Sequence, residues 1–314
     1  MPTERTFSVI LDDETWVGER IDRYLAEGLG IGSRSQIKAR ITALSVNGTD
    51  AKLSRILVHG DTINATIRDP QPPVYAPKEM DLTVMYEDHS VLVVEKEAGV
   101  VVHPGAGHHD QTLIQGVMFR RLEMAGAFED GTRPGVVHRL DKETSGVIIV
   151  AKTPDALAQL ADQFQKRETK KTYLTIVHGR PRKRTGVIDA RIGRDPKHRQ
   201  RFTVVSEGGK RSKTKYHVVR SWGDYSLIAA SPITGRTHQI RVHLLSIGCP
   251  VVGDTVYGRK ADNLPEIGLA LHAYMLGITL PGEKTPTLFR TRFPGRFRRV
   301  IDELNRRPGR RAKG

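Results

Sequence analysis

One acidic side chain stands out as a candidate for chemistry. Asp141 lies in a polar loop between two apolar runs that are typical of strands, with Arg139 two residues before it and Lys142 directly after it. Fixed cations nearby keep a carboxylate ionised and in place, and an ionised Asp can act as a nucleophile or as a general base. The same spacing fits an ordinary ion pair in a loop, so these residues by themselves leave both interpretations open.

Other residue types that often carry chemistry give weaker signals. Cys249 is the single cysteine; it precedes Pro250 without an obvious activating neighbour, so we interpret it as a small buried side chain. His103, His108 and His109 lie close together, but no cysteine or carboxylate accompanies them at a spacing typical of zinc sites. We therefore expect no metal site and interpret these three histidines as loop residues.

The chain is strongly basic, and its charge is unevenly distributed. Its 50 lysines and arginines against 35 acidic residues favour a polyanionic partner such as nucleic acid over a merely soluble basic protein. Residues 166–220 hold 18 basic and only four acidic side chains, whereas residues 1–70 are nearly neutral. We therefore expect backbone phosphates to be bound over residues 166–220, and a basic tail over residues 306–314.

The first part of the chain is predicted to be a small unit over residues 1–68. Its pattern indicates a strand, two short helices and then small strands. In the second helix, predicted over residues 31–44, Ile37, Ile41 and Leu44 form the apolar face. The basic side chains of this helix, which include Arg34 and Lys38, form the opposite face.

A second and larger domain is expected after a linker. Four prolines lie within residues 69–77, so residues 69–80 are predicted to form a stiff, extended connection. Residues 81–305 then mix strand and helix patterns, including an amphipathic helix over 154–168, without a regular alternation of the two. This order favours an α+β fold with a mixed β-sheet over a doubly wound sheet.

Several classes of protein are not expected. The N-terminus lacks a basic start followed by an apolar core, so no signal peptide is predicted. No run of about 18 apolar residues is present, which argues against a membrane span. A single cysteine cannot form a disulfide framework, so we expect a cytoplasmic protein, and we expect it to be a monomer.

Longer motifs resemble the RluA/RluD family of RNA pseudouridine synthases. HRLDKETSG at residues 138–146 is similar to the catalytic signature of that family. Further stretches resemble the family's other motifs in the same order: residues 86–107, 171–179, 234–258 and 269–281. The likeness covers about residues 82–281. Over a shorter stretch, residues 1–68 resemble the small RNA-binding domain first seen in ribosomal protein S-four.

The resemblance implies roles for individual side chains. Asp141 matches the family's nucleophile, and Arg139 matches the arginine that supports an extruded base. Tyr173 matches a pocket tyrosine whose ring can stack on uracil and whose hydroxyl can serve as acid or base. Arg241 matches the arginine that pairs with the catalytic carboxylate, and Leu269 matches an apolar residue that lines the pocket.

The implied reaction also sets expectations about partners. Pseudouridine formation breaks the N-glycosidic bond, turns the uracil and rejoins it through carbon, so no redox change or hydrolysis occurs and no cofactor is required. The target uridine has to leave its stack to reach an Asp inside a protein. We expect large-subunit ribosomal RNA as the substrate because of the ribosomal likeness of residues 1–68, with transfer RNA as the alternative. Arg34 and Lys38 are expected to contact that RNA.

Two other functions account for part of the pattern. An RNA-binding ribosome-assembly factor without required catalysis would explain the charge and the first unit. It would not explain why Asp141, Arg139, Tyr173 and Arg241 all stand at family positions. A glycosylase that uses the same carboxylate would need an activated water and would release free uracil.

Two positions depart from the family pattern. Lys96 is followed by Glu97 where the family usually has proline, and Gln111 stands where a glycine is common. Both belong to the first motif or to the segment after it, so they concern the loop expected to face RNA and not the centre at Asp141.

Overall fold

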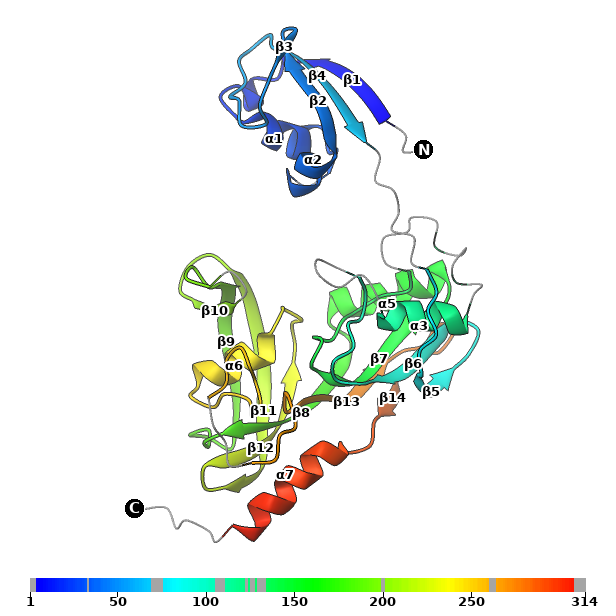
Figure 1. Ribbon diagram of the computed structural model, residues 1–314, viewed down its shortest axis with the longest axis vertical. Coiled ribbons are helices and arrows are strands. Elements are labelled where there is room, and N and C mark those ends of the chain that lie inside the picture. Colours follow the sequence, from blue (N-terminus) through cyan, green and yellow to red (C-terminus); the bar gives the residue numbers. More distant parts are fainter. Residues whose placement is uncertain are drawn as a thin grey trace. The chain divides into compact units, whose positions relative to one another are not determined.

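The computed structural model describes most of the chain and divides it into two compact units, residues 1–74 and 75–314. The described residues are 4–32, 34–68, 76–104, 111–121, 124, 128, 134–198, 201–259 and 264–307. Most of the predicted proline-rich linker and most of the predicted basic tail therefore lie outside the described residues. In Figure 1 the first unit is coloured in blues and the second runs from cyan to red.

The first unit is a four-stranded antiparallel sheet packed against short helices. Its strands follow the order β1-β4-β2-β3. Its elements are β1 (Glu4–Ile10), the 3-10 helix η1 (Glu14–Trp16), α1 (Ile21–Arg23), the π-helix η2 (Tyr24–Gly28), α2 (Arg34–Arg40), β2 (Ile41–Val46), β3 (Thr49–Asp50) and β4 (Thr62–Arg68). Alternate residues of β4, Ile63, Ala65 and Ile67, are buried, as expected for a strand with one face on a core.

The second helix of this unit is shorter than predicted. α2 ends at Arg40, and Ile41 and Leu44, expected on its apolar face, lie in β2. Ile41 pairs with Ile67 of β4, and Leu44 pairs with Ala65. The prediction was wrong here because an apolar spacing that fits a helix also fits a short strand, and a β-branched residue such as Ile41 packs well in a sheet.

The second unit is built on one ten-stranded sheet. The strands follow the order β10-β9-β11-β12-β8-β13-β7-β6-β5, and β14 pairs with β13 off this path. They are β5 (Thr83–Glu87), β6 (Val91–Lys96), β7 (Ser145–Ala151), β8 (Lys170–His178), β9 (Thr185–Arg194), β10 (Phe202–Val205), β11 (Lys210–Trp222), β12 (Tyr225–Pro232), β13 (Leu271–Ile278) and β14 (Thr287–Arg290). Because β13 and β7 run parallel while β13 and β8 run antiparallel, the sheet is mixed, and the predicted α+β fold is confirmed.

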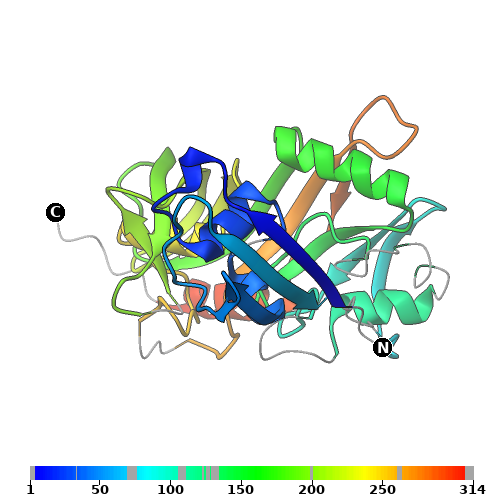
Figure 2. The same ribbon diagram turned by 90° about the horizontal axis from the view of Figure 1, so that it is seen from above.

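Among the described residues of this unit, four helices pack beside the sheet. They are α3 (Leu113–Arg120), α5 (Pro154–Lys166), α6 (Gln239–Ser246) and α7 (Gly295–Arg306). α3 and α5 accompany β5–β7, and α6 accompanies β9–β12, a separation that is visible in both views (Figure 1, Figure 2). Each half has its own apolar core, and Tyr173 of β8 packs against both cores. The junction between the two halves of the sheet is therefore at Tyr173.

The helix that follows β7 forms where the sequence predicts it. Thr153 accepts a hydrogen bond from the backbone N–H of Ala156, and Pro154 occupies the first turn. Such an N-cap stabilises a helix by about 1 kcal/mol. Arg167 ends the helix in a left-handed conformation. Within the part of the chain that the structure describes, no helix is both long and apolar enough to span a bilayer.

Candidate active site

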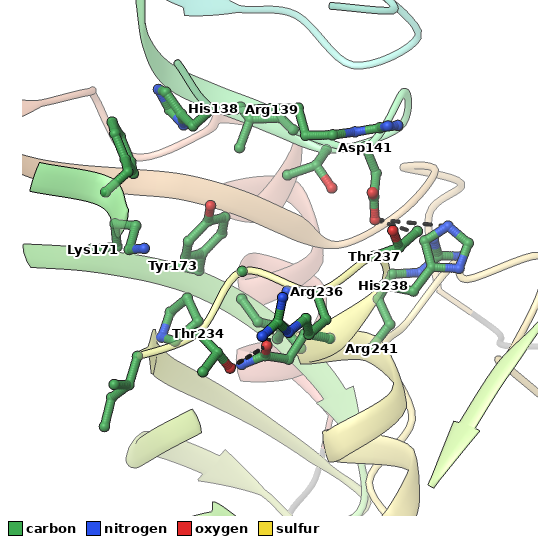
Figure 3. A pocket seen from close by; sticks show the side chains of 18 of the residues that line it. His138, Arg139, Asp141, Lys171, Tyr173, Thr234, Arg236, Thr237, His238 and Arg241 are labelled. Atoms are coloured by element: carbon green, nitrogen blue, oxygen red, sulfur yellow. Dashed lines mark hydrogen bonds and ion pairs between the residues drawn. The ribbon is translucent and has the colours of Figure 1, made fainter. Parts of the chain in front are cut away.

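A cavity of about 490 Å³ opens at the junction of the two halves of the sheet. Its walls come from the loop before β7, from β8 and the end of α5, and from the segment that leads into α6. Asp141, Arg139, Tyr173 and Arg241 all line it. Figure 3 shows these four side chains around one space. The structure thus brings together four of the residues expected to act, although they are up to 102 positions apart in the sequence (139 to 241).

Backbone contacts hold the loop that carries Asp141. The N–H of Thr144 donates to the carbonyl of Asp141 at 3.0 Å and closes a turn. The next carbonyl, that of Lys142, accepts from the buried ammonium of Lys96 at 3.0 Å and from the N–H of Gly99 at 2.9 Å. Lys96 also donates to the carbonyls of Glu97 and Val100, at 2.7 Å each. Lys96 therefore ties the first motif to the loop of Asp141.

The two ends of HRLDKETSG have structural roles. His138 accepts a hydrogen bond from the N–H of Ile149 through Nε2 at 3.1 Å and stacks on Phe164. Burial lowers the pKa of His138 to about 3, so the ring is neutral at neutral pH. At the other end Gly146 has φ 117°, and a Cβ there would overlap the backbone of Ala273 in β13. The motif ends in glycine because β7 and β13 approach closely at that point.

Arg241 is held by a buried carboxylate that the sequence reasoning missed. Its Nε and Nη2 donate to the two oxygens of Asp254 at 2.7 and 2.8 Å, a bidentate pair. Asp254 also accepts from the N–H groups of Val256 and Tyr257. Burial would raise the pKa of Asp254, but the hydrogen bond and charge of Arg241 lower it overall. Asp254 lies in the same long motif as Arg241, which was the available signal.

The remaining nitrogen of this guanidinium faces Asp141. Arg241 Nη1 lies 3.4 Å from Asp141 Oδ2. The Arg241 side chain is 7% exposed, so its charge acts on Asp141 with little screening by solvent. The arrangement places an ionisable carboxylate beside a fixed cation inside a cavity, as a nucleophile or general base requires.

Tyr173 faces the same cavity from β8. Burial and, secondarily, the charge of Asp141 raise its pKa above the ordinary range, so the hydroxyl keeps its proton at neutral pH. Lys171, two residues earlier and on the same side of the strand, also lines the cavity. Burial lowers the pKa of Lys171. Lys171 was not singled out from the sequence, although the alternation of β8 places it beside Tyr173.

The other predicted site residues divide into two groups. Arg139 is exposed, lines the cavity and makes no hydrogen bond or ion pair with the described residues, so its guanidinium is available to a ligand. Leu269 does not line the cavity: it is 3% exposed and belongs to the apolar core. Leu271, two residues later, lines the cavity instead. Leu269 and Leu271 are two positions apart in one apolar stretch at the start of β13, and motif likeness does not distinguish them.

Arg34 and Lys38 belong to the first unit, in α2. Both are exposed, but Arg34 Nη2 is paired with Asp22 Oδ2 at 2.8 Å. The hydrogen bond from Arg20, ahead of the one from Arg34, lowers the pKa of Asp22 to about 2. Arg34 therefore has a carboxylate partner, whereas Lys38 makes no ion pair with a described carboxylate.

The cysteine and the loop histidines, which were not expected to act in catalysis, show no sign of a catalytic or metal site among the described residues. Cys249 is buried, and burial raises the pKa of its thiol. His108 and His109 lie outside the described residues. Among the residues that are described, no three His, Cys, Asp or Glu side chains are grouped so as to hold a metal ion.

Comparisons with known proteins find relatives over most of the chain. The model of the family described as "RNA pseudouridylate synthase" matches residues 90–246. A protein of Borreliella burgdorferi named "Ribosomal large subunit pseudouridine synthase D" is 38% identical over 285 residues, which cover 88% of this chain and 87% of the relative. A protein of the same name from Zymomonas mobilis is 38% identical over 293 residues, with coverage of 90% and 91%.

Solved structures give the same picture of the fold. The human protein "RNA Pseudouridylate Synthase Domain Containing 1" superposes with a TM-score of 0.56 at 25% identity, over 77% of this chain and 99% of that one. The human protein "RNA Pseudouridylate Synthase Domain Containing 4" gives 0.55 at 26% identity, over 71% and 93%. The mixed sheet and its few helices are therefore similar to those of known pseudouridine synthases.

Proposed function

The chain belongs to the RNA pseudouridylate synthase family, and from this premise we propose that it converts specific uridines of large-subunit ribosomal RNA to pseudouridine, with Asp141 as the nucleophile. It is an isomerase that modifies RNA. The observation that carries the proposed mechanism is the contact of Asp141 with Arg241 at 3.4 Å inside a cavity of about 490 Å³. A cavity of that size suits a small ligand such as one flipped-out nucleotide.

The cavity holds candidate groups for bond formation and for stacking on the base. The carboxylate of Asp141 forms a bond to the nucleotide and the C1′–N1 bond breaks. The uracil turns, a C1′–C5 bond forms, and the bond to Asp141 breaks again, which frees the carboxylate. The C5 hydrogen leaves as a proton, and N1 gains one, so the atoms balance. Tyr173 offers a ring for stacking on the uracil and a hydroxyl that is protonated at neutral pH. Arg241, 3.4 Å from the carboxylate, can hold it in place.

Extrusion of the base leaves a gap in the RNA. We assign its support to Arg139, because this guanidinium is exposed beside the cavity and makes no hydrogen bond or ion pair with the described residues. The planar guanidinium of arginine stacks on bases and pairs with them. Arg139 lies two residues before Asp141, so the same short loop would hold both the reacting group and the group that replaces the base.

Ribosomal RNA is the proposed substrate for two reasons. Relatives that are 38% identical over most of the chain carry the name ribosomal large subunit pseudouridine synthase D. Residues 166–220, with 18 basic side chains, would bind phosphates. We further propose that the first unit is an RNA-binding domain of the S-four type, with Lys38 and Arg34 as contacts. Transfer RNA is the alternative substrate.

A tritium-release assay tests the proposal. Ribosomal RNA and transfer RNA labelled with tritium at C5 of uridine lose the label to water when C5 becomes the attachment point to the sugar. We expect release from large-subunit ribosomal RNA and a pseudouridine at the same position by sequencing. Release from transfer RNA alone would contradict the substrate. No release from any cellular RNA would favour the assembly factor without required catalysis.

A further inference from the structure

His238 has an uncommon backbone conformation at the start of α6. It has φ 56° and ψ 16°, the left-handed region that residues with a Cβ rarely adopt. It is also the N-cap of α6, yet its side chain makes no capping hydrogen bond. An asparagine or glycine would satisfy both the backbone and the helix start better. Strained positions of this kind cluster at functional sites.

The backbone conformation directs the imidazole at the catalytic carboxylate. His238 Nε2 lies 3.9 Å from Asp141 Oδ2, and the His238 side chain is 18% exposed. Figure 3 shows His238 and Arg241 on the same side of Asp141. Both approach Oδ2, since Arg241 Nη1 is 3.4 Å from that atom. Among the described residues the second oxygen, Oδ1, has no such partner, which leaves it to face a nucleotide.

A second neighbour of His238, Tyr257, can select one tautomer of the imidazole. The hydroxyl of Tyr257 accepts a hydrogen bond from the N–H of Phe202 at 2.9 Å, and lies 2.9 Å from His238 Nδ1. Since Phe202 already donates to it, the hydroxyl can use its own hydrogen toward Nδ1. Nδ1 is then the acceptor, and a neutral imidazole carries its hydrogen on Nε2, the atom that faces Asp141.

We propose that His238 is a positioning residue for Asp141, and that Tyr257 sets its tautomer. The Nε2–H directs Oδ2 away from the substrate so that Oδ1 is presented to the nucleotide. The distance of 3.9 Å exceeds that of a direct hydrogen bond, and contacts of this kind often tighten only when substrate is bound. The inference rests on the proposed role of Asp141.

The state of the ring agrees with this role. Burial lowers the pKa of His238, while the charge of Asp141 acts in the opposite direction. The imidazole is therefore neutral at neutral pH, and its one N–H is fixed by Tyr257. Tyr257 is in turn fixed by the ring contact with Arg241, whose guanidinium carbon lies 5.0 Å from the ring centre. One connected set of side chains thus orients a single carboxylate.

Three variants of the full chain test the inference. His238→Gly relieves the left-handed strain but also removes the contact with Tyr257 and adds entropy to the unfolded chain, so these effects oppose each other and the melting temperature should shift by only about 4 °C or less. Its kcat for tritium release should fall about ten- to hundredfold, the effect of one hydrogen bond to a charged group, with KM within about threefold. His238→Asn tolerates the backbone and offers an amide N–H, and should recover part of kcat. Tyr257→Phe frees the tautomer and should lower kcat less than His238→Gly does.

The controls separate a structural role from a positioning role. Gln111 has φ 56° in the same unit, so Gln111→Gly measures the change in melting temperature that strain relief alone produces. Full kcat in His238→Gly, or an Asn variant no better than the Gly variant, would overturn the inference. Asp141→Asn distinguishes a failure of the proposed function from a failure of the role of His238. If it retains activity, the proposed function fails; if it is inactive while His238→Gly is fully active, only the role of His238 fails.

Discussion

The buried pair of Arg241 and Asp254 is predicted to be essential for both stability and catalysis. Asp254→Asn keeps the size of the side chain but removes the charge that faces Arg241. Asp254 has a fully buried side chain and accepts two hydrogen bonds from the guanidinium and two from backbone N–H groups. The amide can accept only through its oxygen, so its NH2 group would oppose donors, and Arg241 would keep a buried charge without its main partner.

The magnitude follows from these contacts. Breaking one partner of a buried ion pair costs about 3–5 kcal/mol of unfolding free energy. In a domain the size of the second unit, 1 kcal/mol shifts the melting temperature by about 2–4 °C. The variant should therefore melt about 6–20 °C lower. Because Arg241 is no longer held, the kcat for tritium release should also fall, even at temperatures where the variant is folded.

Circular dichroism melting and single-turnover tritium release measure the two effects. Asp189→Asn is the matched control, because Asp189 pairs with Lys213 at 3.0 Å on the surface, where the Asp side chain is 59% exposed. Such a pair contributes about 0–1 kcal/mol, so the control should melt within about 4 °C of the parent. Equal shifts in the two variants, or an Asp254→Asn variant with unchanged melting and kcat, would refute the reasoning.

Three further predictions concern pH, the pocket and the first unit. Burial lowers the pKa of His272 to about 4 from the ordinary 6.5. As the pH falls from about 6.5 to about 4, this histidine is therefore protonated in the unfolded chain but still neutral in the folded protein. The second unit should lose about 1.4 kcal/mol of stability per pH unit there from this residue, and urea unfolding of His272→Gln at pH 7 to 5 should show a flatter slope. Tyr173→Phe should lower kcat about 10²- to 10⁴-fold while filter binding shows RNA affinity within a few-fold, since only the protonated hydroxyl is lost; an unchanged kcat would exclude the hydroxyl. Lys38→Ala should make the dependence of log affinity on log salt shallower by just under one, and an unchanged slope would remove Lys38 from the RNA contacts.

The elements that follow local rules were predictable from the sequence. The helix after β7 begins at Pro154 behind the Thr153 cap and ends near the predicted residue, because caps and apolar spacing are local signals. The second helix of the first unit was predicted too long. Ile41 and Leu44 pair with β4 instead, and pairing with a strand that lies more than twenty residues away in sequence leaves no local trace.

Most residues of the site could be predicted from the sequence, but the contacts between them could not. Asp141, Arg139, Tyr173 and Arg241 were singled out from motifs, and the structure brings them to one cavity. Asp254 was missed because the need for it appears only once Arg241 is seen to be buried. Leu269 was chosen where Leu271 lines the cavity, because motif likeness does not tell which of two neighbouring apolar residues points inward.

The structure also shows what the two departures from the family pattern, at Glu97 and Gln111, change in the chain. Gln111, where a glycine is common, has φ 56°, a conformation that glycine adopts without strain. Lys96 keeps its three carbonyl partners although Glu97 replaces the usual proline. The structural anchor of the first motif is therefore the lysine ammonium, and its contact with Glu97 uses the backbone carbonyl and not the side chain.

The central claim is that Asp141 carries the chemistry, and one substitution tests it most directly. Asp141→Asn keeps the volume of the side chain and its place beside Arg241 but removes the nucleophilic carboxylate. Single-turnover assays on large-subunit ribosomal RNA labelled at C5 of uridine should show no tritium release above background, while filter binding shows affinity within a few-fold of the parent. Tritium release at the parent rate by Asp141→Asn would contradict the account.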